Sequence, residues 1–328
     1  MIGRAVLLTV WLAAPVAAQD SYVAVIVGLG GEAEHAETFR RWAGSLVDHA
    51  AGRLEIPRAR ILYLLDDPQQ DAKRTPGKAT KAEIEKGLAA MGAAAKADDV
   101  VFIVLIGHGT FDGKVAKFNL PGPDITPAEF GTILGRFSTK NIVFVNTASA
   151  SGPFVEALTG KVRVVVTATR SGAEKFATVF GGYFIDALAG DAADADKNRR
   201  VSVLEAFNAA KIDVARVYEQ RGIMLTERAL LEDGGDGEGS LDPAVNGKDG
   251  SVAAVLSLGA PKEALALPSD PKLRQLHEER RALEQRAESL KLLKASMPPA
   301  QYAEELEKVL TELARKSKEI RDLEGKGR

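Results

Sequence analysis

The chain has 328 residues, of which 45% are hydrophobic and 27% are charged, the profile of a folded globular protein. Forty-three lysines and arginines against 45 acidic residues give a formal net charge of −2, so the overall charge gives no reason to expect a nucleic-acid partner. The sequence contains no cysteine, which excludes disulfides, thiolate metal sites and any cysteine nucleophile.

The first 18 residues have the pattern of a cleaved signal peptide. Arg4 precedes an apolar run over residues 5–14, and residues 16–18 offer small side chains for cleavage before Gln19. A membrane anchor is the alternative, but the run is shorter than the roughly 20 residues that span a bilayer. We therefore expect residues 1–18 to be removed, a secreted or periplasmic mature protein, and no stable insertion into a membrane.

Between residues 19 and 259, short β-branched runs alternate with stretches of helical length, which predicts an α/β domain with crossover helices. The expected strands cover residues 22–28, 60–65, 100–106, 142–146, 162–167 and 251–258. Three of them (VVFIVLIG, IVFVN and VRVVVTAT) are almost continuously apolar, as expected for parallel strands covered on both faces. Functional side chains should then lie at the carboxyl ends of the strands.

A glycine-rich segment, Gly28-Leu29-Gly30-Gly31, follows the first expected strand. It departs from the dinucleotide-binding motif because Ala33 stands in place of the third glycine. The acidic residues that end the second strand, Asp66 and Asp67, come about 36 residues on rather than about 20. We interpret the segment as a glycine-rich turn, and no cofactor is required.

Two further segments follow the third and fourth expected strands. The first is Ile106-Gly107-His108-Gly109, and the second is Asn146-Thr147-Ala148-Ser149-Ala150-Ser151-Gly152. Because the carboxyl ends of neighbouring parallel strands meet at one edge, we expect both segments at one rim. Together they resemble the catalytic segments of the caspase and legumain class of cysteine peptidases, in which one strand ends in His-Gly and the next in an acidic-x-Cys-x-Ser-Gly pattern. The resemblance covers roughly residues 22–258.

This resemblance implies a fold and a catalytic centre. The fold is the caspase-like three-layer αβα sandwich with a mostly parallel sheet. His108 matches the base of the family, and Gly109 matches the residue whose backbone N–H helps to form the oxyanion hole. Ser149 stands where the family has its nucleophilic cysteine.

The resemblance also implies substrate-binding residues. Arg40 matches the arginine that legumain-type enzymes place in the pocket for the residue before the scissile bond. Thr147 stands where a carboxylate is usual, which changes the polarity of that pocket. Ser151 matches the serine of the Ser-Gly pair after the nucleophile.

Serine at the nucleophile position has a chemical consequence. A cysteine–histidine dyad works because a thiol with a pKa near 8.5 is readily ionised by an imidazole. A serine hydroxyl is far less acidic, and serine nucleophiles typically need a third group that orients the histidine. Three readings remain open: a catalytically inactive peptidase homologue that binds peptide or protein segments, an active endopeptidase that uses Ser149 with His108, or a domain in which Gly107-His108-Gly109 is only a turn.

A second group of oxygen-bearing side chains lies between residues 194 and 205. Its spacing matches the oxygen ligands of an EF-hand-like calcium loop. The candidate ligands are Asp194, Asp196, Asn198, Ser202 and Glu205. Arg199 stands where such loops usually have glycine. The alternative is an acidic turn that caps the following helix.

The remaining polar segments give no clear site. Residues 230–250 are rich in glycine and aspartate, and we expect a long surface loop there. Within it, residues 232–238 resemble a loop of bacterial members of the same peptidase class. His35, His49 and His277 lack ligand spacing and are expected at the surface.

The C-terminal part differs in composition from the α/β domain. Residues 260–271 form a proline-containing linker, and residues 272–328 form a charged tail with leucine spacing. Apolar residues repeat every seven positions on each side of Pro298-Pro299: Leu276, Leu283 and Leu290, then Leu306, Leu313 and Ile320. This pattern predicts a helical hairpin or coiled coil. It either packs on the rest of the chain or serves as an interaction arm, including self-association.

Overall fold

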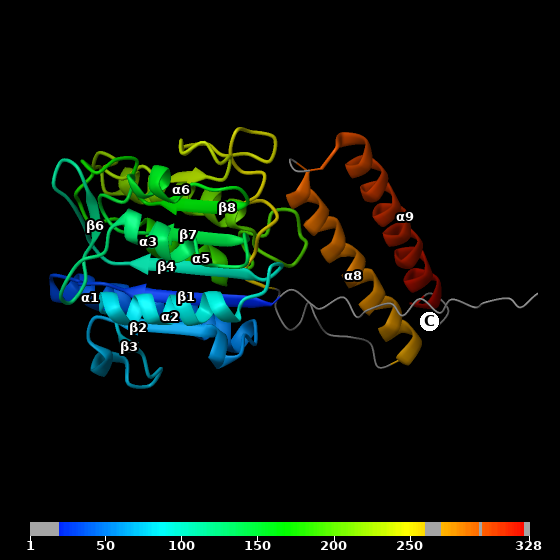
Figure 1. Cartoon of the computed structure of the whole chain (residues 1–328), viewed down its shortest axis with the longest axis horizontal. Helices are drawn as coiled ribbons and strands as arrows, with labels where there is room; N and C mark the ends of the chain where they lie inside the picture. Colours follow the sequence, from blue (N-terminus) through cyan, green and yellow to red (C-terminus); the bar gives the residue numbers. More distant parts are fainter. Residues whose placement is uncertain (1–19, 260–269, 295–296, 325–328) are drawn as a thin grey trace, which may run out of the picture.

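The computed structural model describes residues 20–259, 270–294 and 297–324. A seven-stranded sheet forms the centre of the α/β domain, in the order β3-β2-β1-β4-β7-β8-β9 (Figure 1). The strands are β1 (Ser21–Val27), β2 (Ile61–Leu65), β3 (Gly77–Lys78), β4 (Val100–Ile106), β7 (Ile142–Asn146), β8 (Arg163–Thr167) and β9 (Leu230–Glu232). All neighbouring pairs are parallel except β8 and β9. A separate two-stranded hairpin consists of β5 (Gly109–Phe111) and β6 (Ala116–Phe118).

Helices cover both faces of the sheet, as the unbroken apolar strands require. One face carries α1 (Ala33–Asp48), α5 (Phe180–Ala189) and α6 (Val203–Gln220). The other carries α2 (Lys81–Ala94), α3 (Pro127–Leu134) and α4 (Phe154–Leu158). Short helical turns η1 (His49–Arg53), η2 (Arg58–Arg60) and η3 (Pro68–Asp71) join these elements. The predicted fold class, a three-layer αβα sandwich with a mostly parallel sheet, is confirmed.

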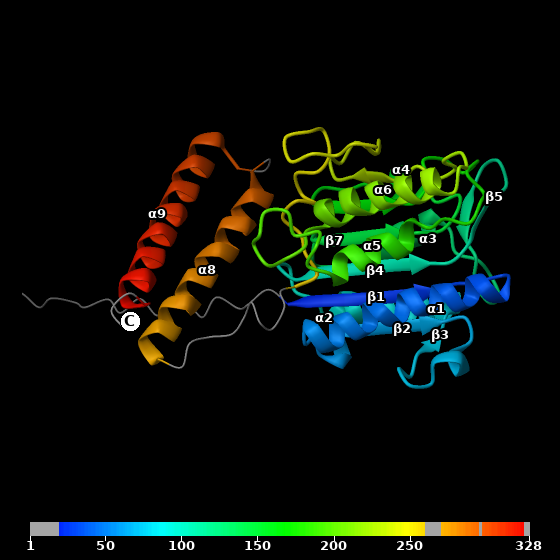
Figure 2. The same cartoon turned by 180° about the vertical axis from the view of Figure 1, so that it is seen from behind.

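The C-terminal hairpin is also confirmed. Helices α8 (Pro271–Leu293) and α9 (Pro299–Glu324) pack on each other and bury Ala287, Leu290 and Val309 between them. Leu276 and Ile320 are buried as well, whereas Leu283 and Leu313 are half-buried. The hairpin lies beside the edge of the sheet at which the parallel strands begin, opposite their carboxyl ends (Figures 1 and 2). No helix among the described residues is long and apolar enough to cross a membrane.

Two expectations for the end of the α/β domain were wrong. The predicted strand over residues 251–258 is a series of turns, because its backbone binds the start of α6: Leu256 O and Ala253 O accept the N–H groups of Val203 and Leu204. The predicted surface loop over residues 230–250 begins instead with β9. It also contains fully buried carboxylates at Glu232 and Asp249. The predicted signal peptide and most of the linker lie outside the described residues.

Candidate functional site

The two peptidase-like segments meet at the carboxyl edge of the sheet. β4 and β7 are parallel neighbours, and Leu105 pairs with Asn146 at their ends. His108 and Ser149 therefore leave adjacent strands at the same rim. Both segments are packed closely, since a Cβ on Gly109 would lie 2.3 Å from Ser149 O.

A backbone carbonyl fixes the orientation of His108. Its Nε2 lies 3.0 Å from Gly30 O. Because a carbonyl can only accept, Nε2 carries a proton, and in the neutral imidazole Nδ1 then has the lone pair. Burial lowers the pKa of His108, and the bond to Gly30 and the charge of Glu32 oppose this shift. The imidazole is therefore a neutral, oriented base.

The glycine-rich turn after β1 makes this contact possible. A Cβ at Gly30 would lie 2.5 Å from Ala36 Cα, so a side chain there would push the turn away from α1. Gly31 has a φ of +67°, in the left-handed region that favours glycine. The sequence predicted a plain turn, but the turn also supplies the carbonyl that holds His108.

Aromatic rings enclose the other sides of His108. The rings of His35 and Phe39 each lie 5.2 Å from its imidazole, centroid to centroid, in edge-to-face arrangements. Both come from the start of α1. His35, which was expected at the surface, is half-buried, with its ring against His108.

The hydroxyl of Ser149 binds the main chain of Gly109. Ser149 Oγ donates to Gly109 O at 3.1 Å and accepts from Gly109 N–H at 3.2 Å. Ser149 is only 3% exposed. Within the described part of the chain no hydrogen bond joins Ser149 to His108. The hydroxyl thus occupies the backbone donor that the resemblance assigns to the oxyanion hole.

The turn after Ser149 is strained and held by the loop after β8. Ala150 has a φ of +53°, which is unfavourable for a residue with a Cβ. Its N–H donates to Glu174 O at 2.8 Å. Ser151 Oγ lies 3.1 Å from Thr169 Oγ1, which also accepts from Gly152 N–H. The turn is therefore also held by groups other than the Ser149 side chain.

The other two predicted substrate residues are placed differently. Thr147 is buried, and its hydroxyl donates to Leu105 O at 2.8 Å. Arg40 is half-buried in α1, where its charge acts on Tyr63 of β2. Neither side chain makes a hydrogen bond to His108 or Ser149 within the described residues. The ring of His35 packs on His108, and the charge of Glu32 acts on the same imidazole.

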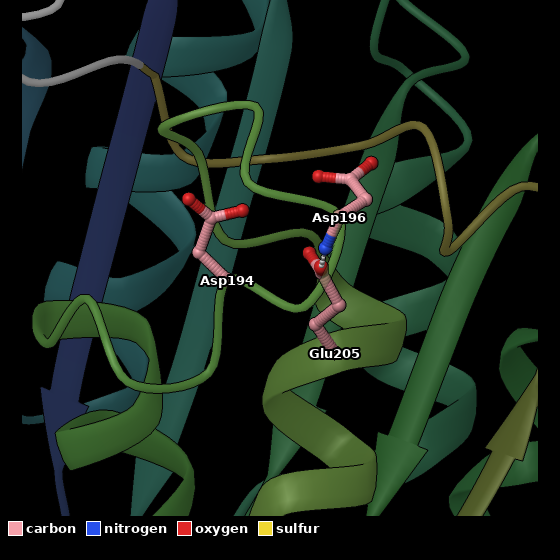
Figure 3. A group of neighbouring side chains, drawn as sticks. All are labelled: Asp194, Asp196 and Glu205. Carbon is pink, nitrogen blue, oxygen red and sulfur yellow. Dashed lines mark hydrogen bonds between the residues drawn. The ribbon is translucent and has the colours of Figure 1, made fainter.

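The candidate calcium ligands gather at the start of α6. Oxygen atoms of Asp194, Asp196 and Glu205 lie within 4.8 Å of one another. Figure 3 shows Glu205 on the first turn of the helix, below the loop that carries the two aspartates. Ser202 caps α6 in a reciprocal pair with Glu205. Asn198 donates from its side chain to Asp196.

The same carboxylates already accept backbone hydrogen bonds. Glu205 Oε1 accepts from Ala195 N–H at 2.8 Å, and Asp194 Oδ2 accepts from Arg199 N–H at 2.9 Å. Three cations, at Lys197, Arg199 and Arg200, stand in the same twelve residues as the three carboxylates. The loop is therefore close to neutral, which lowers its expected affinity for a divalent cation.

A second acidic region lies beside β9. Glu232 and Asp249 are fully buried and Asp233 is almost fully buried. Burial raises the pKa of Glu232 and of Asp233, while backbone N–H donors oppose the rise. Asp233 accepts from the N–H groups of Gly250, Val252 and Ala253, so this carboxylate holds residues 250–253 beside β9.

Part of the chain is similar to a known protein family. Residues 81–229 match the model of the Peptidase C13 family, which is the legumain family. The predicted resemblance is confirmed for this stretch, which includes His108 and Ser149; Gly30 and the helical hairpin lie outside it. A search of the curated proteins found no match. Protein GSU0716 from Geobacter sulfurreducens is a similar solved structure, with 13% identity and a TM-score of 0.42 over 65% of this chain and 92% of that one.

Proposed function

We propose that this protein is a legumain-type peptidase homologue without cysteine peptidase activity, and that its rim around His108 and Ser149 binds a peptide or protein segment. The observation that supports this most strongly is the pair of hydrogen bonds between Ser149 Oγ and the main chain of Gly109. They give the hydroxyl a structural role in the turn.

The chemistry of hydrolysis would have to break both bonds. His108 would need to take the proton that Ser149 donates to Gly109 O, and the N–H of Gly109 would need to leave Ser149 to stabilise an oxyanion. A hydroxyl is also a much weaker acid than a thiol, so the imidazole would generate little alkoxide. The rim therefore keeps its shape without an effective nucleophile.

One observation favours a second candidate, an endopeptidase that uses Ser149 with His108. His108 is neutral and is oriented by Gly30 O, which replaces the carboxylate of a serine triad as the orienting group. His108 is thus available as a base, although the Ser149 hydroxyl is hydrogen-bonded to Gly109 instead. Action through the α8–α9 hairpin alone is the third candidate.

Export and calcium binding belong to the same proposal. Cleavage before Gln19 would release the mature protein into the periplasm or medium, and intact-mass measurement of exported material tests this. Calcium binding by the loop of Asp194, Asp196 and Glu205 is supported by the convergence of the three carboxylates. The ion would then stabilise the start of α6 and take no part in chemistry at the opposite edge of the sheet.

A Ser149→Cys variant tests the rim directly. The new thiol can be ionised by His108, so a peptide electrophile directed at thiols should label it. The label should fall strongly in the double variant with His108→Ala, whereas the wild type, which has no cysteine, gives the background. Unlabelled peptides with Asn, Asp, Arg or Lys at the reacting position should compete if the rim binds peptides. Labelling that is independent of His108 and insensitive to every competitor would contradict the proposal.

A further inference from the structure

A cavity of about 250 Å³ lies at the carboxyl edge of the sheet, beside the end of β8 and the start of β9. Its apolar walls come from Ala168 after β8, Phe180 of α5, Val214 of α6, and the side chains of Leu225 and Leu241. A cavity of about 150 Å³ with apolar walls is large enough for benzene. The site can therefore hold a leucine- or phenylalanine-sized group.

The buried carboxylate in the cavity wall is fully engaged. Glu227 is 3% exposed and accepts from Val179 N–H, Phe180 N–H and the hydroxyl of Tyr218. These bonds cap the start of α5 and leave the carboxylate no role toward a ligand. Glu227 therefore adds no unpaired negative charge to the apolar cavity.

Two cationic side chains line the cavity, Lys211 and Arg228, and they differ in whether they already have hydrogen-bond partners. Lys211 binds Leu241 O and Asp242, so its ammonium closes one side of the cavity. Arg228 also lines the cavity, and its guanidinium makes no hydrogen bond or ion pair within the described residues. Arg228 is therefore the one lining cation among them that is available to an anion.

We propose that this cavity binds a compact apolar group that carries a carboxylate, with the apolar part between Phe180 and Val214 and the carboxylate on Arg228. Guanidinium groups pair with carboxylates in two-pronged hydrogen bonds, which gives the site its charge preference. The C-terminal residue of a peptide and a free medium-chain carboxylic acid share this chemistry.

Hydrogen bonds of Glu174 connect the wall of the cavity to the rim around His108 and Ser149. Glu174 Oε2 accepts from Arg228 N–H at 3.0 Å, and the carbonyl of Glu174 accepts from Ala150 N–H at 2.8 Å. Occupancy of the cavity is thereby linked to the turn that carries Ser149. The proposal itself stands whether or not the rim has the function proposed above, because none of the cavity residues belongs to that rim.

Calorimetric titration of the full chain tests the site with defined probes. 4-Phenylbutanoate is compared with 4-phenylbutanamide, and a short peptide ending in leucine with its C-terminal amide. We expect each carboxylate to bind at least roughly tenfold more tightly than its amide. Preference for the peptide acid or for the free acid then identifies the natural source.

Three variants make the test specific. Arg228→Gln should remove the preference for the carboxylate, whereas Arg221→Gln, an exposed arginine at the end of α6, should leave it unchanged. Val214→Phe should fill the cavity and abolish binding of both probes, with the melting temperature as the control for folding. Equal affinity for acid and amide in the wild type, no binding of either, or an unchanged preference in Arg228→Gln would overturn the proposal.

Discussion

Removing the hydroxyl of Ser149 should destabilise the protein. Ser149→Ala deletes two hydrogen bonds to the main chain of Gly109 in a turn where residue 149 is 3% exposed. At about 0.5–1.5 kcal/mol for each bond, the loss is about 1–3 kcal/mol in the free energy of unfolding. For an α/β domain of this size, each kcal/mol lowers the melting temperature by about 2–4 °C.

Thermal and denaturant unfolding measure this change. Ser45→Ala is the matched control, because Ser45 is exposed on α1 and makes no side-chain hydrogen bond within the described residues. It should stay within about 0.5 kcal/mol of the wild type. A free nucleophile would behave differently, since its removal often leaves stability unchanged or raises it. An equally stable or more stable Ser149→Ala variant would refute a structural role for the hydroxyl.

Four further predictions concern other parts of the molecule. His108 should titrate below the ordinary histidine value of about 6.5 by NMR, with the proton on Nε2, because burial lowers its pKa. A raised value would show that burial does not dominate at this imidazole. Millimolar-scale calcium should raise the melting temperature of the wild type but not of Glu205→Gln; an unchanged wild type would leave Glu205 as a helix cap alone. Burial raises the pKa of Glu232, so its contribution to stability is complete below its ordinary pKa and is lost as the pH rises through the raised value. Glu232→Gln should flatten this part of the plot of stability against pH, and an identical plot would show that another group is responsible. Leu283→Asp should lower the helicity of the α8–α9 hairpin in circular dichroism and leave the main unfolding transition of the sheet domain in place; a single shifted transition would show that the two fold together.

The rim could be predicted because its two main residues follow strands. Three unbroken apolar runs identify parallel neighbours, and the ends of such strands must meet, so His108 and Ser149 could be placed together from sequence alone. The orienting group of His108 could not be found in this way. It is the carbonyl of Gly30, and a backbone carbonyl has no residue type of its own. The only signal was the run of glycines that allows the turn to approach.

Other features depended on packing that local sequence does not encode. The motif assigns Arg40 to the substrate pocket, and that assignment stays a prediction, whereas the contact of His35 and Phe39 of α1 with His108 could not be read from any motif. The segment around Glu232 has the composition of a surface loop. Its carboxylates are nevertheless buried: Glu232 accepts from Gly235 N–H close by, and Asp233 accepts from Gly250 N–H, 17 residues further along the chain. The composition of the segment does not reveal this second, long-range contact.

Turnover of peptides by the wild-type protein tests whether the rim around His108 and Ser149 has peptidase activity. Purified protein is incubated with fluorogenic peptides that carry Asn, Asp, Arg or Lys before the scissile bond, beside the His108→Ala and Ser149→Ala variants. We expect no turnover by the wild type above the level of either variant, because the Ser149 hydroxyl is hydrogen-bonded to Gly109 and not to His108. Hydrolysis by the wild type that disappears in both variants would contradict it and establish a serine peptidase.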